Sequence, residues 1–277
     1  MKDIYRIAEK LNLDDRILKL LRNETSYPLH INDFHALETY WYPHPPCLVP
    51  LFLGHGAFYH GVIKHFFCER QPTFAEYILE DGYISEIARN ADQFITLMLL
   101  KIIMNKDGLT DEIIHFCHSI DFEGYDEIDR FIVDYGDDPN EFEHLTFFKN
   151  KKPFKHIKNL DEYNGDFPSS LCILNTNLHL QNACSLEIAP VEKLNSIEHI
   201  PSWLIESKNQ KELFSHYLSR NELREAWLTL NSKNWLLKDV ASGLDLFKSK
   251  TDDDLFHMVA DNWIAGWKNS NFSNSNY

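Results

Sequence analysis

The clearest pattern in the chain is an apolar stripe with a helical period between residues 84 and 104. Apolar side chains recur three or four positions apart, and polar residues such as Glu86, Arg89 and Lys101 stand between them. This spacing gathers the apolar side chains on one face of an α-helix, and that face must be buried. We therefore predict one long core helix over residues 84–104. Its expected buried side chains are Ile87, Ala91, Phe94, Ile95, Met98 and Leu99.

Short apolar runs that favour β-structure precede this helix. Residues 48–53 and 57–67 are separated by Gly54-His55-Gly56, a pattern that predicts a β-hairpin. Pro50 lies in the first run, and because proline cannot donate a backbone hydrogen bond, we expect an edge or terminal position for this strand. Residues 73–76, Thr-Phe-Ala-Glu, have the form of a capping box, which predicts that a helix begins there.

Helical spacing also appears toward both ends of the sequence. We predict a helix over residues 4–21 that is interrupted at Asn12, a short helix over residues 31–40, and a helix from Thr110 to Ser119. Short strands are expected at residues 171–174 and 186–188, followed by helices up to residue 267. The predicted fold class is α+β, with a small antiparallel sheet, a central hairpin, surrounding helices and a helix-rich C-terminal half.

The charge of the chain changes sign abruptly near its middle. Residues 121–143 contain ten Asp or Glu residues against Arg130 alone, and residues 149–158 are rich in lysine. We interpret this composition shift as a connection between two parts of the chain. The expected organisation is an N-terminal α+β domain over residues 1–120, an acidic-then-basic connecting segment over residues 121–158, and a helix-rich part with short strands over residues 159–277.

The overall charge and the cysteines narrow the expected partners and location. The formal net charge of −15 repels polyanions, so we expect a basic protein partner and no nucleic acid. The longest apolar stretch, residues 98–104, is too short to span a membrane, and the first residues lack the pattern of a secretory signal. The five cysteines are scattered and never spaced Cys-x-x-Cys, which is typical of free thiols in a reducing cytosol. We expect a cytoplasmic protein.

Short motifs for catalysis or cofactor binding are missing from the sequence. No Gly-Lys-Ser/Thr loop occurs, and the glycines around His55 do not have the spacing of a dinucleotide-binding loop. Glu112 with His115, and Glu141 with His144, match the Glu-x-x-His motif of di-iron proteins. The partner carboxylates that such a site needs do not form a clear pattern. We expect no cofactor and no bound metal.

One segment, residues 43–103, has the pattern of a known family. It contains the strand-like run Leu48-Val49-Pro50-Leu51-Phe52, then a glycine-rich turn and the aromatic run Ala57-Phe58-Tyr59. These motifs resemble the central strands of the SMI1/KNR4, or SUKH, superfamily, although His55 and Ala57 replace that family's acidic or glycine doublet. The resemblance implies an α+β fold with helices packed around a small sheet. Many bacterial members are immunity proteins, which bind a cognate toxin delivered by a neighbouring cell.

These features together predict a non-catalytic immunity protein that binds a basic toxin and occludes its active site. The expected partner-binding residues are Asp134, Asp137, Asp138, Glu141, Trp41 and Tyr42. The acidic side chains would pair with a basic groove, and the aromatic side chains would supply apolar anchors. Two alternatives stay open: a regulatory scaffold subunit, and an enzyme whose site is built from His55, His60, His115 or His118.

Overall fold

The computed structural model describes the chain in several stretches. The described residues are 4–25, 27–28, 34–37, 41–54, 58–79, 83–149, 151–156, 202–204, 208–232, 235–272 and 275. The strands predicted at residues 171–174 and 186–188 lie outside these stretches, as do His55, Cys172 and Cys184.

Five antiparallel strands form one sheet in which each strand pairs with the next one along the chain. The strands are β1 (His35–Ala36), β2 (Leu48–Gly54), β3 (Phe58–Ile63), β4 (Thr73–Ile78) and β5 (Tyr83–Ala88). The pairing of β2 with β3 confirms the predicted hairpin. Strand β1 pairs only with Phe52 and Leu53, so β1 does not extend to Pro50, which sits at a register shift in the β2–β3 ladder. The helix predicted over residues 31–40 is wrong at β1.

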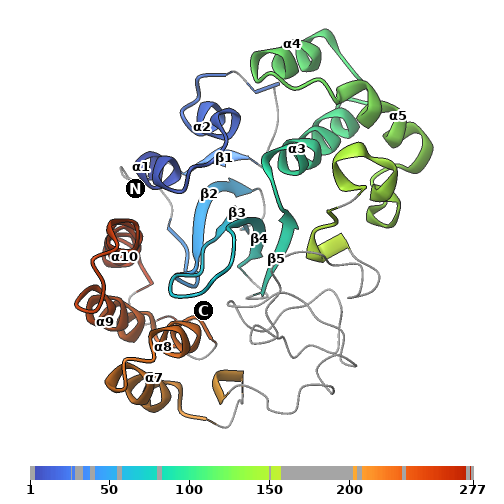
Figure 1. Cartoon of the computed structure of the whole chain (residues 1–277). Helices are drawn as coiled ribbons and strands as arrows, with labels where there is room; N and C mark the ends of the chain where they lie inside the picture. Colours follow the sequence, from blue (N-terminus) through green and yellow to red (C-terminus); the bar gives the residue numbers. More distant parts are fainter. Residues whose placement is uncertain are drawn as a thin grey trace.

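Helices surround the sheet and dominate the C-terminal half. They are α1 (Ile4–Lys10), α2 (Asp15–Leu21), α3 (Ala91–Asn105), α4 (Asp111–Ser119), α5 (Tyr125–Tyr135), α7 (Gln210–Ser219), α8 (Leu223–Leu230), α9 (Leu237–Lys248) and α10 (Asp254–Lys268). Short 3-10 helices are η1 (Pro139–His144), η2 (Thr146–Phe148), η3 (Phe154–His156) and η5 (Ser202–Leu204). Figure 1 shows α3, α4 and α5 grouped on one side of the sheet and α7 to α10 grouped on another. The protein is an α+β protein, as predicted.

Helix α3 begins at Ala91 and not at residue 84, because residues 83–88 form strand β5. The side chains of residues 84–88 are all buried, so their apolar pattern does not alternate and resembles that of a helix. Asn90 marks the true start, since its side-chain oxygen caps the helix by accepting a hydrogen bond from the backbone of Gln93 at 3.0 Å. The six side chains predicted to be buried are all buried.

Residues 73–78 form strand β4, so the helix start predicted from the Thr-Phe-Ala-Glu motif is wrong. A capping box stabilises a helix only when the following residues are helical. Here Thr73, Phe74, Tyr77 and Ile78 are residue types that fit a pleated strand, and β4 pairs on both sides with β3 and β5. Pairing within the sheet satisfies the backbone groups and overrides the local signal.

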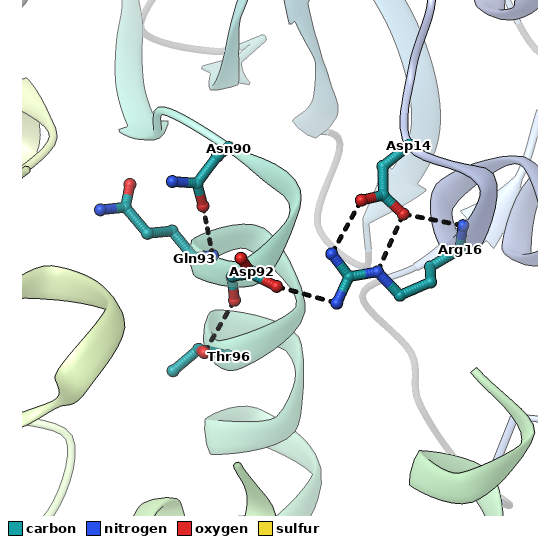
Figure 2. Close-up of polar contacts among 6 residues, drawn as sticks. All are labelled: Asp14, Arg16, Asn90, Asp92, Gln93 and Thr96. Carbon is teal, nitrogen blue, oxygen red and sulfur yellow. Dashed lines mark hydrogen bonds and ion pairs between the residues drawn. The ribbon is translucent and has the colours of Figure 1, made fainter. Parts of the chain in front are cut away.

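The N-terminal end of α3 is fixed by a polar network that reaches to α2 (Figure 2). Arg16 bridges two carboxylates: it contacts Asp14 at 2.7 Å and Asp92, in the first turn of α3, at 2.8 Å. Asp14 is also the N-cap of α2, which confirms that a second helix starts after the break at Asn12. Thr96 donates a hydrogen bond to the backbone carbonyl of Asp92 at 2.7 Å. The network therefore sets the position of α3 relative to α2.

Phe94 is the side chain through which α3 packs on the sheet. Its ring centroid lies 4.6 Å from that of Phe74 and 5.9 Å from that of Phe52, and both pairs are stacked. Phe34 meets the same ring edge-on, with a centroid distance of 5.8 Å. Each of these rings is buried, and aromatic contacts of this kind dominate the stability of a core.

The core continues from the N-terminal helices to the C-terminal ones. One cluster of buried apolar side chains includes Ile7 of α1, Phe94 of α3 and Trp263 of α10. Trp263 donates a hydrogen bond from its indole nitrogen to the carbonyl of His44 at 2.9 Å. The backbone nitrogen of Cys47 donates to the side chain of Asn231 at 2.7 Å. The described residues of the predicted N-terminal and C-terminal parts therefore share one core.

A buried ion pair lies between the β3–β4 connection and strand β5. Arg70 contacts Glu86 at 3.1 Å, and the Glu86 side chain is 0% exposed. Arg70 also donates a hydrogen bond to the hydroxyl of Thr73 at 3.2 Å. Removal of either Arg70 or Glu86 would leave the other as an uncompensated buried charge, which is strongly destabilising.

Phe94→Ala should lower the free energy of unfolding by about 3–5 kcal/mol, because it removes a ring that fills the space between α3 and the sheet. The matched control is Val133→Ala on α5, where the residue is 79% exposed and a change of about 0.5 kcal/mol or less is expected. Urea denaturation of both variants measures the difference. Equal effects at the two positions would contradict the packing role of Phe94.

The stability of the protein should fall between pH 6.5 and pH 4 because of His44. Burial lowers the pKa of His44 to about 4, against a smaller opposing effect of its hydrogen bond to the Tyr42 carbonyl. In this pH window the unfolded chain takes up a proton at His44 that the folded protein does not, so acid favours unfolding by about 3 kcal/mol in total. The comparison is urea denaturation of the wild type and His44→Gln across this range. The variant should show the shallower pH dependence, and parallel curves would refute the assignment.

Candidate binding pocket

A cavity of about 300 Å³ lies between the sheet, helix α3 and the segment from residue 137 to residue 156. Its walls are largely apolar and aromatic, with several ionisable side chains among them. The residues that line it include His60, Glu76, Phe94, Lys101, Met104, Asp137, Phe142, Lys155 and His156. A concave, mostly apolar site with a few converging polar groups is the usual form of a ligand pocket.

Strand pairing places His60 and Glu76 side by side in this pocket. They are directly opposite residues of β3 and β4, and opposite residues of an antiparallel pair point to the same face of the sheet. Their neighbours Val62 and Phe74 are also paired and also face α3, where Phe74 stacks on Phe94. The face of the sheet that packs on α3 therefore carries a cross-strand His–Glu pair within an aromatic layer.

Glu76 contacts two potential cations. Its Oε1 lies 2.5 Å from Nζ of Lys155, and its Oε2 lies 3.6 Å from Nε2 of His60. Burial raises the pKa of Glu76, but the interactions with His60 and Lys155 more than offset this effect and hold the pKa well below its usual range. The pocket thus contains a carboxylate that stays ionised although its side chain is only 15% exposed.

Aromatic rings hold His60 and Lys101 in place. The His60 ring stacks on Phe34 with centroids 4.6 Å apart, and Phe58 meets it edge-on at 5.0 Å. The Lys101 ammonium lies 5.7 Å from the ring centroid of Phe34 and 5.5 Å from that of Phe58. A cation over an aromatic face is attracted by the ring's electron density, so these rings favour an ammonium at this wall of the pocket.

The outer wall is formed by the segment after α5, which α3 holds through Gln93. The side-chain amide of Gln93 donates hydrogen bonds to the carbonyls of Phe147 and Lys151, at 2.9 and 2.5 Å. His156 lies in the same wall, with its ring centroid 4.7 Å from that of Phe142. Burial lowers the pKa of His156 to about 3, so the ring is neutral at neutral pH. Its two ring nitrogens are buried and have no hydrogen-bond partner among the described residues.

An acidic surface adjoins the pocket. We use this term for Asp134, Asp137, Asp138 and Glu141, on α5, η1 and the turn between them. Asp134, Asp137 and Asp138 are exposed, whereas Glu141 is partly buried and contacts His144 at 3.3 Å. Asp137 also lines the pocket. All four acidic residues predicted to bind a partner therefore lie in one stretch of the fold, next to a cavity.

The predicted aromatic anchors lie elsewhere. Trp41 is buried, and its ring packs edge-on against Trp263 with centroids 5.3 Å apart. A Cβ atom added to Gly266 of α10 would lie only 2.1 Å from the Trp41 ring. Tyr42 is partly buried, and its backbone nitrogen donates to the hydroxyl of Tyr59. Trp41 therefore cannot serve as the predicted anchor for a partner, because its ring is buried and fills a space between the N-terminal segment and α10.

Exposed apolar side chains appear instead beside the acidic surface. Val133 on α5 is strongly exposed, and Tyr135 and Met104 are exposed as well. The Tyr135 ring stacks on His144, with centroids 4.8 Å apart and planes at 3°. Met104 lies at the end of α3 and lines the pocket.

The histidines considered for an enzyme do not share a site. His60 lies in the pocket, whereas His115 and His118 are exposed on α4, where His118 contacts the hydroxyl of Tyr125 at 3.2 Å. Within the described stretches no three His, Cys, Asp or Glu side chains gather in a way that would hold a metal ion. Among the described cysteines, Cys47 and Cys117 are buried and Cys68 is partly buried.

The fold and the cavity define an α+β protein with a small, partly charged pocket beside an acidic surface. None of its described helices is long and apolar enough to cross a membrane. Comparisons of the chain with protein-family models, with curated proteins and with solved structures gave no match.

Lys155→Met should raise the pKa of Glu76, because it removes the ammonium group that lies 2.5 Å from the carboxylate. The ¹³C shift of the Glu76 carboxyl carbon, followed against pH, measures this change. Lys152→Met is the matched control, since Lys152 pairs with Glu143 at 2.9 Å and not with Glu76. An unchanged titration of Glu76 in Lys155→Met would show that the ion pair is not formed in solution.

Proposed function

We propose that this protein is a cytoplasmic, non-catalytic binding protein of the immunity type, which neutralises a basic toxin by covering its active site. The observation that carries the proposal is the acidic surface with exposed apolar side chains beside it. A protein that binds a basic groove needs negative charge around the contact and a few apolar anchors near its centre.

The charge of this region supports the proposal. Several carboxylates of the segment serve the fold: Asp129 accepts a hydrogen bond from the backbone of Leu109, and Glu127 accepts two from Thr146. By contrast, Asp134 and Asp137 are exposed and make no ion pair with any residue in the described part of the chain. Uncompensated surface charge of this kind raises the rate at which an oppositely charged partner associates.

The apolar side chains supply the second requirement. Val133 and Tyr135 precede and follow Asp134 in α5, and both are exposed, so helix α5 presents apolar side chains as well as a carboxylate to solvent. Large exposed side chains gain binding energy when a partner covers them and excludes water. Tyr135 and Val133 thus take the place that the sequence suggested for Trp41.

The family resemblance of residues 43–103 supports the same function, since many bacterial SUKH proteins are immunity proteins. Strands β2 and β3 lie within this segment. The acidic surface lies outside it, so the proposed contact is a feature of this chain and not of the shared pattern.

An enzyme is the second candidate, and the His60–Glu76 pair in the pocket is the observation that favours it. A histidine beside a carboxylate is a common arrangement for general acid–base catalysis. If the purified protein converts a small molecule, and His60→Gln abolishes the conversion while folding is intact, the binding-protein proposal is wrong.

Reversal of three charges, Asp134→Lys, Asp137→Lys and Asp138→Lys, should slow association with the toxin by about tenfold or more at 0.1 M salt. The effect should shrink at 1 M salt, where the screening length falls from about 10 Å to about 3 Å. Stopped-flow association rates across this salt range, with inhibition of the toxin as a second measurement, give the test.

The control for this experiment reverses the same number of charges at Glu69, Asp245 and Asp252, which are exposed on other parts of the surface. The control should bind nearly as fast as the wild type. If both triple variants slow association equally, only net charge matters and the acidic surface is not the contact.

A further inference from the structure

The pocket already holds a cation that comes from the chain itself. Lys155 stands in η3, a 3-10 helix of three residues, and its ammonium group reaches Glu76 of β4. The Lys155 side chain is 38% exposed, whereas the Glu76 side chain is 15% exposed. The carboxylate is thus the inner partner of the pair and the lysine the outer one, so the lysine is the partner that can move away.

The charges of the pocket favour a positively charged occupant if Lys155 leaves. The lining contains two carboxylates, those of Glu76 and Asp137, and two ammonium groups, those of Lys101 and Lys155. His156 adds no charge, because its ring is neutral. Without Lys155, Glu76 would keep only the His60 ring, at 3.6 Å, as its partner among the described residues, and the cationic end of an incoming side chain could take the place of the lost ammonium group. The aromatic rings of Phe94 and Phe142, also in the lining, would contact the cation's hydrocarbon part.

The position of the pocket points to the source of that cation. Asp137 belongs both to the acidic surface and to the pocket lining, and Met104 joins the lining to the exposed apolar side chains. A partner that binds the acidic surface would therefore lie beside this pocket. The cavity volume is at the low end of the range of about 300–1,000 Å³ that is usual for ligand pockets, which suits one extended side chain.

We propose that the pocket receives one arginine or lysine side chain of the basic partner, whose cationic end replaces Lys155 on Glu76. This inference rests on the proposed function, because it names the anchor that the partner uses. Lys155 then acts as an internal competitor. It keeps the Glu76 carboxylate paired while the protein is free, and it weakens binding because only the molecules in which Lys155 has left Glu76 can accept the incoming cation.

The pocket can be tested with a small probe before any partner is known. Butylguanidinium carries the hydrocarbon stem and the cationic end of an arginine side chain, and butylurea has nearly the same shape without the charge. Both are titrated into the full-length protein, and the methyl resonance of Met104 and the ring resonances of Phe142 report binding. Butylguanidinium should bind saturably and shift these resonances, and butylurea should bind at least about tenfold more weakly.

Two substitutions should change this binding in opposite directions. Glu76→Gln should weaken butylguanidinium binding about tenfold or more, since the ionised partner is lost. Lys155→Met should tighten it about twofold to fivefold, as expected for removal of a partly exposed competing ion pair. Lys152→Met, in the same segment but paired with Glu143, should leave it unchanged. Near-UV circular dichroism confirms that each variant is folded.

Equal binding of butylguanidinium and butylurea would overturn the inference, as would a Lys155→Met variant that binds no tighter than Lys152→Met. The second result stays informative even if Glu76→Gln fails to fold.

A toxin partner separates this inference from the proposed function. Substitution of its basic residues one at a time by Met should reveal one residue at which the effect of Glu76→Gln disappears. If charge reversal of the acidic surface slows association but no basic residue couples to Glu76, the anchor is wrong and the function stands. If the probe binds as expected but the protein inhibits no toxin, the pocket is a site for small cations and the proposed function is wrong.

Discussion

The packing of Phe94 between α3 and the sheet is the contact on which the remaining arrangement depends. It fixes the height of α3 above β2 and β4, where Phe52 and Phe74 stack on the same ring. Through α3 it also sets the position of α5, which packs on that helix, and of the segment tied to Gln93. The pocket has Phe94 in one wall and that segment in another. Its shape is therefore a consequence of how one helix sits on the sheet.

Local patterns in the sequence identify elements well where only one face is buried. The cap at Thr110 and the C-terminal helices appear as predicted, whereas α3 accounts only for the later part of the helix predicted over residues 84–104. Strands β4 and β5 were missed because nearly every described residue in them is buried, which removes the alternation that marks a strand. Their identity depends on backbone pairing, of β4 with β3 and of β5 with β4, and this pairing leaves no trace in the local residue pattern.

The acidic part of the candidate site could be found from composition alone, since carboxylates in such density are too polar to be buried together. The pocket could not. Glu76 is separated from Lys155 by 79 residues, and His60 meets it only through the register of β3 with β4. The sequence marks His60 as one of several candidate histidines, but the Thr-Phe-Ala-Glu motif predicts a helix cap for its partner Glu76. The burial of Trp41 could not be predicted either. A tryptophan close to several prolines has the local pattern of an exposed loop, and its cover comes from α10, far along the chain.

The contact of Trp263 with His44 constrains the order in which the protein can fold during its synthesis. These residues are 219 positions apart, so a ribosome must synthesise α10 before the segment around Trp41 and His44 can be covered. Until then the Trp41 ring and the surrounding core remain open to water and to chaperones. Contacts between such distant positions also slow folding, because a long loop must close before they form. Removal of α10 should therefore make the rest of the protein prone to aggregation, because the aromatic side chains around Trp41 would be exposed.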